Sequence, residues 1–231
     1  MSGPADRLPR DARRLPRGRH GLPRAFVVEN QRARIFESLA IVSATKGYAD
    51  VTVKDIIDHA GVSRRTFYDL FADKEQCFLA AYDEIVERLF AAVDRAYSAE
   101  RRPWAERIAA ALHALVENYA SEPELARLAM VDVLAAGPTA LDRRDATLRR
   151  FAVFFAEGLV GLPAATALDG LLSQAVVGGL YEALYAYIVD GQAERLPELM
   201  PDLIYCALVP YLGHPRALQE IEADRRAGAE L

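Results

Sequence analysis

The fold is decided by residues 52–74, which read TVKDIIDHAGVSRRTFYDLFADK. The apolar side chains of the first part recur at helical spacing and give a short helix one apolar face: Val53, Ile56, Ile57 and Ala60. Gly61 follows directly, and glycine adopts without steric cost the left-handed conformation that ends a helix. A second short helix then carries polar, basic and aromatic side chains. Two short helices about a tight turn are the layout of a helix-turn-helix, whose second helix enters the major groove of DNA.

Three helix starts are predicted around this stretch by their capping residues. Thr52 stands where an N-cap belongs, and Asp55 three residues later completes a pair like a capping box. Ser63 is placed to cap the second short helix. Asp73, with Gln76 at the third helical position, opens a long helix after it. Three capped starts so close together indicate short helices with defined ends.

Spacing alone also allows an ordinary helical hairpin with Arg64 and Arg65 on a solvated face, but the residue identities favour the helix-turn-helix. The run resembles the DNA-binding signature of the TetR family of bacterial transcription regulators, in which T-V-x-x-I-x-x-x-A-G-V-S leads into T-x-Y-x-x-F-x-x-K-E. The matching residues here are Thr52, Val53, Ile56, Ala60, Gly61, Val62, Ser63, Thr66, Tyr68, Phe71, Lys74 and Glu75. A preceding helix, expected over residues 29–46, fits the same pattern.

Side-chain chemistry and the resemblance together assign roles in this segment. Arg64 and Arg65 are candidates for bidentate contact with guanine edges. Asp69 is expected either to accept a hydrogen bond from a cytosine amino group or to hold an arginine in place. Ser63, the cap, belongs to the same DNA-binding set. The remaining members are expected to contact phosphates, which position a protein without reading sequence: Thr52, Thr66, Tyr68 and Lys74.

The net charge of −5 looks unfavourable for a DNA-binding protein until it is divided along the chain. Residues 1–25 hold seven arginines against two aspartates, whereas residues 26–74 carry seven basic and seven acidic side chains. The remainder therefore carries −10. Four prolines in the first 25 residues indicate a basic, Pro-rich, disordered arm. This arm either lies along phosphates or in the minor groove, or is a solvated tail or the product of a misassigned start codon.

Several classes of function are disfavoured by what the sequence lacks. Cys77 and Cys206 lie far apart and follow no metal-ligand spacing, so we expect neither a disulfide scaffold nor a metal site, and a reducing cytoplasm is the simplest location. Glu182 interrupts the best apolar run, residues 175–189, so no membrane span is predicted. No signal-peptide core, phosphate-binding loop or serine elbow is found. We therefore expect neither an enzyme nor a bound cofactor.

After the helix-turn-helix the chain reads as one amphipathic helix after another, without the alternation typical of strands. The prediction is an all-α protein of about nine helices. A three-helix DNA-binding domain is expected over residues 26–74, a helical effector-binding and dimerisation domain over residues 75–213, and a charged tail over residues 214–231. The sixth helix is expected to end near Ala136, and the seventh to continue through its aromatic residues to Leu159.

The last two predicted helices, residues 167–189 and 197–212, are apolar nearly all round. Such helices need burial on several sides, which a second subunit supplies in a domain this small; burial within one chain is the alternative. The resemblance supports a homodimer, since TetR-like proteins pair these helices as a four-helix bundle and so present two recognition helices to a palindromic operator. The expected interface residues are Val176, Gly179, Leu180, Ala183, Tyr187, Leu203, Ala207 and Tyr211.

The resemblance also implies a small-molecule cavity among the middle helices. The side chains expected to line it are equally typical of an ordinary core: Trp104, Tyr119, Met130, Phe151, Phe155, Tyr181 and Tyr185. Such walls suit a largely apolar effector. The predicted function is a ligand-responsive transcriptional regulator, in which repression rather than activation rests on the resemblance. The alternatives are a helical small-molecule-binding or protein-interaction module that does not read DNA, and a helical enzyme for which no catalytic set can be named.

Overall fold

The computed structural model describes residues 23–99, 102–160 and 170–229, and all regular secondary structure in these ranges is helical. This confirms the predicted all-α fold, with ten α-helices described rather than about nine. Most of the predicted arm and the predicted start of the eighth helix, at residue 167, lie outside the described residues. Within the described ranges, no helix combines the length and the apolar character needed to cross a membrane.

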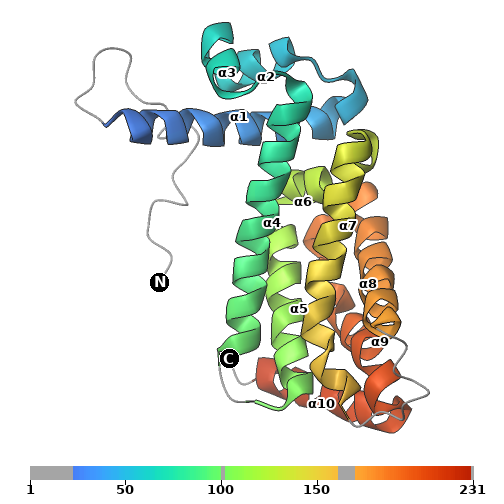
Figure 1. The fold of residues 1–231 in the computed structure, drawn as a ribbon. Coiled ribbons are helices and arrows are strands. Elements are labelled where there is room, and N and C mark those ends of the chain that lie inside the picture. Colours follow the sequence, from blue (N-terminus) through green and yellow to red (C-terminus); the bar gives the residue numbers. More distant parts are fainter. Residues whose placement is uncertain (1–22, 100–101, 161–169, 230–231) are drawn as a thin grey trace.

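A three-helix head lies at one end of a longer body (Figure 1). The head consists of α1 (Arg24–Lys46), the 3-10 turn η3 (Tyr48–Asp50), α2 (Val53–Ala60) and α3 (Arg64–Leu70). The helices of the body are α4 (Lys74–Ser98), α5 (Trp104–Ser121), α6 (Pro123–Met130), α7 (Pro138–Ala152), α8 (Leu171–Val189), α9 (Met200–Leu212) and α10 (His214–Ala229). Its 3-10 segments are η4 (Asp132–Ala135), η5 (Val153–Phe155), η6 (Glu157–Leu159) and η7 (Ala193–Leu199). Figure 1 shows α1 crossing the head end of α4, which then runs the length of the body.

The buried side chains form two cores, and α4 belongs to both. The head core collects side chains of α1, α2, α3 and the first half of α4, up to Val86. The body core begins at Leu89 on the same helix. The change from one core to the other therefore occurs inside a continuous helix. The domain division expected at residue 74 remains a prediction, and this packing does not require it.

The short helix α6 connects the two cores. Leu128 and Ala129 are buried in the head core, whereas Ala126 and Met130 are buried in the body core. Val133 of η4 follows them into the head core. Any shift of α6 must therefore disturb the packing beneath α1 as well as the packing of the body.

Three predicted helix boundaries are wrong, two at the end of a helix and one at its start. The sixth helix stops at Met130, and η4 follows it. The seventh stops at Ala152, and the aromatic residues after it lie in η5 and η6. Residues 197–199 lie in η7, so the ninth helix begins later than predicted. A 3-10 turn repeats every three residues or so and an α-helical turn about every 3.6, so apolar spacing over a single turn does not distinguish them.

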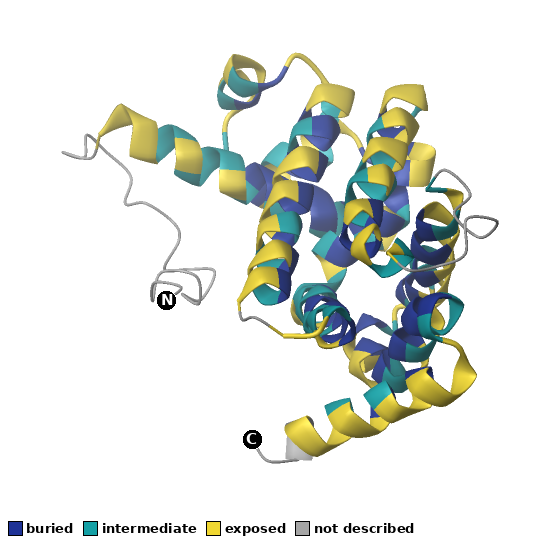
Figure 2. Ribbon diagram, turned by 60° about the horizontal axis from the view of Figure 1, so that its bottom comes forward, coloured by how far each residue is buried: buried dark blue, intermediate teal, exposed yellow. Residues whose placement is uncertain are grey.

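Within the predicted charged tail, residues 214–231, the structure has a helix, α10, over residues 214–229. Ala217 and Ile221, four residues apart, are buried against the body, and His113 Nε2 of α5 lies 2.9 Å from Asp224 Oδ1. Figure 2 shows that the outer face of α10 is exposed. A narrow apolar stripe is enough to fix this helix while its charged residues face solvent.

Gly158 in η6 is the position where we expect the smallest substitution to have a large effect. A Cβ there would lie 2.5 Å from Cη2 and Cζ2 of Trp104 and 2.9 Å from Cδ1 of Tyr211. Because such overlap forces the rings to move, Gly158→Ala should lower the free energy of unfolding by about 1–3 kcal/mol. Urea unfolding followed by circular dichroism measures this loss. Trp104→Phe removes both indole atoms, so the same glycine substitution should cost much less in that background. An equal cost in both backgrounds would rule out this contact as the cause.

Candidate DNA-binding surface and ligand pocket

The predicted capping box is present at the start of α2. Thr52 Oγ1 accepts a hydrogen bond from the Asp55 amide at 3.2 Å, and Asp55 Oδ2 accepts one from the Thr52 amide at 2.9 Å. Lys46, the last residue of α1, donates to Asp55 Oδ1 at 2.6 Å. The hydrogen bonds from Lys46 and then from Thr52 hold the pKa of Asp55 well below its usual range. This carboxylate therefore caps α2 and also fastens it to α1.

The turn between α2 and α3 has the predicted geometry. Gly61 adopts the left-handed conformation, with φ 62° and ψ 38°. Ser63 Oγ accepts a hydrogen bond from the Thr66 amide at 3.0 Å and so caps α3. Sequence reasoning missed Arg34 of α1, whose guanidinium donates to the carbonyls of Ala60 and Gly61 at the end of α2. The turn is thus fixed by a backbone requirement and by a cation from the neighbouring helix.

One face of α3 is anchored and the other is exposed. Phe67 is fully buried in the head core, while Arg64, Arg65, Tyr68 and Asp69 are exposed on the opposite side. The Arg65 side chain is 90% exposed, and its Nε lies 3.8 Å from Asp69 Oδ2. The Arg64 guanidinium lies 5.6 Å from the centre of the Tyr68 ring. The structure therefore gathers the residues predicted to read bases on one accessible helix face.

Lys74 is held more tightly than the other predicted DNA contacts. Its Nζ donates to the carbonyls of Tyr48 at 2.9 Å and Ala49 at 3.4 Å, and it lies 4.3 Å from the centre of the Tyr48 ring. Burial lowers its pKa. Lys74 thus ties the η3 turn to the start of α4, and its contact with phosphate remains a prediction. Sequence reasoning missed Tyr48, whose only signal was an aromatic residue between two predicted helices.

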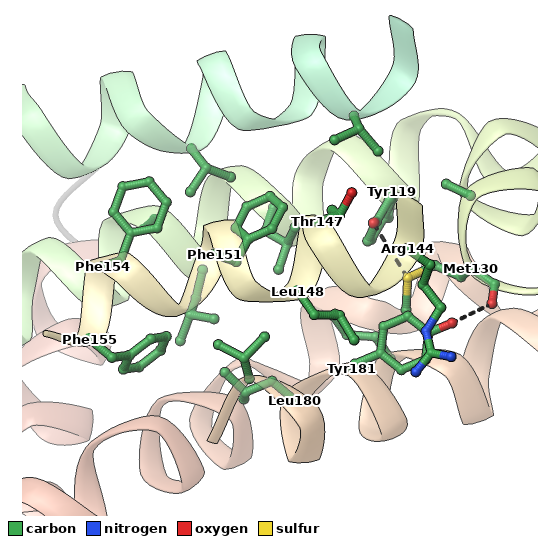
Figure 3. Close-up of a pocket in the computed structure, with 18 of the residues that line it drawn as sticks. Tyr119, Met130, Arg144, Thr147, Leu148, Phe151, Phe154, Phe155, Leu180 and Tyr181 are labelled. Atoms are coloured by element: carbon green, nitrogen blue, oxygen red, sulfur yellow. Dashed lines mark hydrogen bonds between the residues drawn. The ribbon is translucent and has the colours of Figure 1, made fainter. Parts of the chain in front are cut away.

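A cavity of about 90 Å³ lies between α4, α5, α6, α7 and α8 (Figure 3). Five of the seven residues predicted to line it do so: Tyr119, Met130, Phe151, Phe155 and Tyr181. The other two lie outside the lining. Trp104 packs behind Phe155 and donates its indole N–H to the Phe154 carbonyl at 3.0 Å, and Tyr185 stacks on Tyr181 with ring centres 6.3 Å apart.

The cavity also has a polar end that sequence reasoning missed. Arg144 and Thr147 of α7 belong to the lining, as does Tyr82 of α4. The Tyr82 hydroxyl donates to Thr147 Oγ1 at 3.2 Å, and the Tyr181 hydroxyl donates to the Met130 carbonyl at 2.7 Å. Arg144 was overlooked because it stands in a run of charged residues, 142–145, that is typical of a solvated face. Among the described residues, no cluster of His, Cys, Asp and Glu is arranged to hold a metal ion.

Comparison with known proteins identifies the helix-turn-helix. The family model described as "Bacterial regulatory proteins, tetR family" matches residues 36–81. The HTH-type transcriptional regulator EthR from Mycolicibacterium smegmatis is 28% identical over 114 residues. Residues 36–81 thus match the DNA-binding region of the TetR family. The match to EthR covers 49% of this chain and spans only about half, 52%, of that regulator's length.

Solved structures extend the likeness to the body of this protein. The fatty acid degradation regulator FadR from Bacillus halodurans superposes with a TM-score of 0.68 at 19% identity, covering 77% of this chain and 94% of that one. FadR from Bacillus subtilis, solved in complex with stearoyl-CoA, has a TM-score of 0.63 at 18% identity over 79% of this chain and 98% of that one. At such identities the likeness concerns the fold.

The predicted dimer surface is only partly accessible. Five of the eight expected interface residues are buried within the chain itself: Val176, Leu180, Leu203, Ala207 and Tyr211. Gly179 and Ala183 are exposed, and Tyr187 is half-buried. The exposed residues border a groove of about 350 Å³ between α8 and α9. A helix that is apolar all round does not reveal which side faces its own chain. The sequence therefore could not separate the residues buried within the chain from those exposed at the groove.

The Asp55 carboxylate predicts a pH dependence of the stability of this protein. In the folded state the pKa of Asp55 lies below its ordinary value of 3.8, so the ionised carboxylate stabilises the folded state. This contribution is complete above the pKa of the unfolded chain, about 4, and is lost as the pH falls toward the folded-state value. Asp55→Asn should therefore lower the urea midpoint at neutral pH, and its difference from the wild type should shrink below about pH 4.

The matched control for this measurement is Asp58→Asn on the same helix. Asp58 pairs with the exposed Lys54, four residues before it, and such an exposed pair contributes little to stability, so its loss should have little effect. A deficit of Asp55→Asn that stays constant from neutral pH to about pH 2 would contradict the role assigned to the ionised carboxylate.

Proposed function

We propose that this protein is a ligand-responsive transcriptional repressor that binds a palindromic operator as a dimer and is released by a small, largely apolar effector. The observation that carries the proposal is the exposed face of α3, which the buried Phe67 and the Ser63 cap hold in place. Its predicted DNA contacts are Thr52, Ser63, Arg64, Arg65, Thr66, Tyr68, Asp69 and Lys74. A cytoplasmic location follows from DNA as the partner.

The local charges of α3 suit base reading. The Arg65–Asp69 pair is long, at 3.8 Å, and both side chains are mostly exposed. Such a pair contributes little to stability, so Arg65 can exchange Asp69 for a guanine at small cost. The segment 26–74 carries no net charge. We therefore propose that the basic arm, residues 1–25, supplies much of the non-specific attraction to phosphates.

Two relatives support a regulator that responds to a ligand. EthR is, by its name, a transcriptional regulator of the helix-turn-helix type. FadR from Bacillus subtilis binds stearoyl-CoA in its solved structure. We propose that residues 26–74 bind DNA and that residues 75–213 bind the effector and form the dimer.

The size of the cavity suggests how an effector changes DNA binding. Sites for drug-sized ligands measure roughly 300–1,000 Å³, so a cavity of about 90 Å³ admits such a ligand only when its walls move. A ligand shifts an equilibrium by its differential affinity for the two states. Because α6 forms part of the wall and also enters the head core, we propose that the effector-bound arrangement moves the head out of register with the operator.

The α8–α9 face is our proposed dimer interface. Gly178 and Gly179 lie in the interior of α8, where glycine destabilises a helix by about 0.5–1 kcal/mol relative to alanine. A Cβ at either position would meet nothing within 4 Å. Packing inside the chain therefore does not explain these glycines, whereas the close approach of a partner helix does.

The DNA-binding proposal is tested by electrophoretic shift on the promoters of this protein's own and neighbouring genes. Arg65→Ala should weaken operator binding by about 1–3 kcal/mol, roughly tenfold to a hundredfold, with little effect on random DNA. Lys74→Ala should weaken both about equally, since a phosphate contact carries no sequence information. Arg226→Ala on the exposed side of α10 is the control. Equal losses of Arg65→Ala on both DNAs would refute base reading, and no wild-type shift would favour a binding module that does not read DNA.

The dimer proposal is tested with a charge placed in the groove. Ala183→Arg should convert the dimer to monomer in sedimentation equilibrium and weaken operator binding, because it buries an unpaired charge between two subunits. Ala91→Arg puts the same residue on the exposed face of α4 and should leave both properties unchanged. A dimer that persists in Ala183→Arg would move the interface to another surface.

A further inference from the structure

Arg144 is a charged residue in the cavity lining, and its polar atoms are incompletely paired. Its neighbours Arg143 and Arg150 on α7 bind the carboxylates of Asp83 and Glu87 on α4. Among the residues that the structure describes, Arg144 forms an ion pair with the adjacent Asp145 alone, with Nη1 and Oδ1 3.6 Å apart. Its Nε is buried and has no hydrogen-bond partner among the described residues. A buried donor left unpaired costs about 1–3 kcal/mol, so this guanidinium is prepared for an acceptor that the described residues do not provide.

A second hydrogen-bond donor at the same end of the cavity has only a weak acceptor among the described residues. The buried Tyr119 hydroxyl donates to Met130 Sδ at 3.4 Å, and a thioether is a weak acceptor. Burial raises the pKa of Tyr119, so the hydroxyl keeps its proton. Figure 3 shows Arg144, Tyr119 and Met130 together at this end, beside Tyr181. The Arg144 guanidinium lies 5.1 Å from the centre of the Tyr181 ring, which limits the directions it can take.

The remainder of the cavity is apolar and extends away from this polar end. Leu148, Phe151, Phe154 and Phe155 succeed one another along α7 and η5, and Figure 3 shows Phe154 and Phe155 at the end opposite Arg144. A molecule that satisfies both parts has an anionic group at one end and an extended apolar body. A cation is repelled by Arg144, and a neutral molecule leaves the Asp145 carboxylate, 3.6 Å away, as the nearest countercharge of the guanidinium.

We propose that the effector is an amphipathic monocarboxylate, bound with its carboxylate at Arg144 and Tyr119 and its apolar chain running toward Phe154 and Phe155. This inference rests on the proposed function, in that it names the chemistry of the effector. A carboxylate accepts two parallel hydrogen bonds from a guanidinium and one from the Tyr119 hydroxyl. The ligand carboxylate then replaces Met130 Sδ as the acceptor of the Tyr119 hydroxyl, and Met130 is the last residue of α6. The anionic end of the ligand thus acts where the cavity meets the helix that packs into the head.

Calorimetric titration with octanoate, decanoate and dodecanoate, each compared with its methyl ester below the micelle concentration, tests the proposal. Each ester keeps the chain and the carbonyl and removes the charge. The wild type should bind at least one acid roughly tenfold or more tightly than its ester, as expected for hydrogen bonds to a charged group. Arg144→Gln should abolish that preference and leave ester binding within about twofold. Arg144→Lys, which keeps the charge but loses the bidentate geometry, should be intermediate.

Arg149→Gln is the matched control, since Arg149 is exposed on the same helix and outside the lining. It should keep the full preference for the acid. The single tryptophan, Trp104, provides a second readout. Its ring lies against Phe155, with centres 6.4 Å apart, so a chain that reaches the apolar end should change its emission. Esters that bind as well as acids, equal losses of both in Arg144→Gln, or no binding of any acid would overturn the proposal.

A DNA-binding assay on the same proteins separates this inference from the proposed function. Without ligand, Arg144→Gln should bind the operator like the wild type, and the acid should release only the wild type and the Arg149→Gln control. Acid that binds with the expected preference but releases no DNA would leave the site standing and refute the effector role. Absence of operator binding by every protein would refute the proposed function, while the calorimetric comparison still decides the carboxylate site.

Discussion

The packing of α6 between two cores is the constraint on which the rest of the structure depends. The helix has eight residues, and its Leu128 is fully buried in the head core while Met130 lines the cavity. Protein interiors are close-packed, so a helix buried on both sides cannot approach one core without opening the other. One short helix therefore links the contents of the cavity to the position of the DNA-binding head.

The connection between head and body is reinforced at η3. The Tyr48 ring packs on Phe78 of α4, with centres 4.7 Å apart, and the Tyr48 carbonyl accepts from Lys74. Asp132 of η4 is buried nearby; desolvation raises its pKa, while Arg127 and the Tyr48 backbone act in the opposite direction. Its Oδ2 has no hydrogen-bond partner among the described residues. An incompletely paired buried carboxyl destabilises the arrangement that contains it.

The parts of the fold that the sequence predicts well are those fixed by local chemistry. Capping residues act within one turn of the backbone, and the starts of α2, α3 and α4 lie where Thr52, Ser63 and Asp73 predict them. The failures involve tertiary packing. The apolar surface of α8 gives no sign that Leu180 faces its own chain and Ala183 faces outward. Arg144 cannot be told from its arginine neighbours by sequence. It contacts Tyr181 of α8, whereas Arg143 and Arg150 pair with carboxylates of α4.

Two walls of the cavity are connected to the head. α7 is tied to α4 by the ion pairs of Arg143 and Arg150, and α4 continues into the head core; α6 reaches that core through Leu128. Because the cavity of about 90 Å³ excludes an extended ligand, nearly all the binding free energy is differential between the two states. Each buried methylene contributes about 0.8 kcal/mol, and inverting a two-state population from 1:99 to 99:1 takes about 5.5 kcal/mol. A chain of roughly seven methylenes supplies that amount. In the proposed mechanism, the apolar length between Arg144 and Phe155 therefore determines how completely an effector switches the protein.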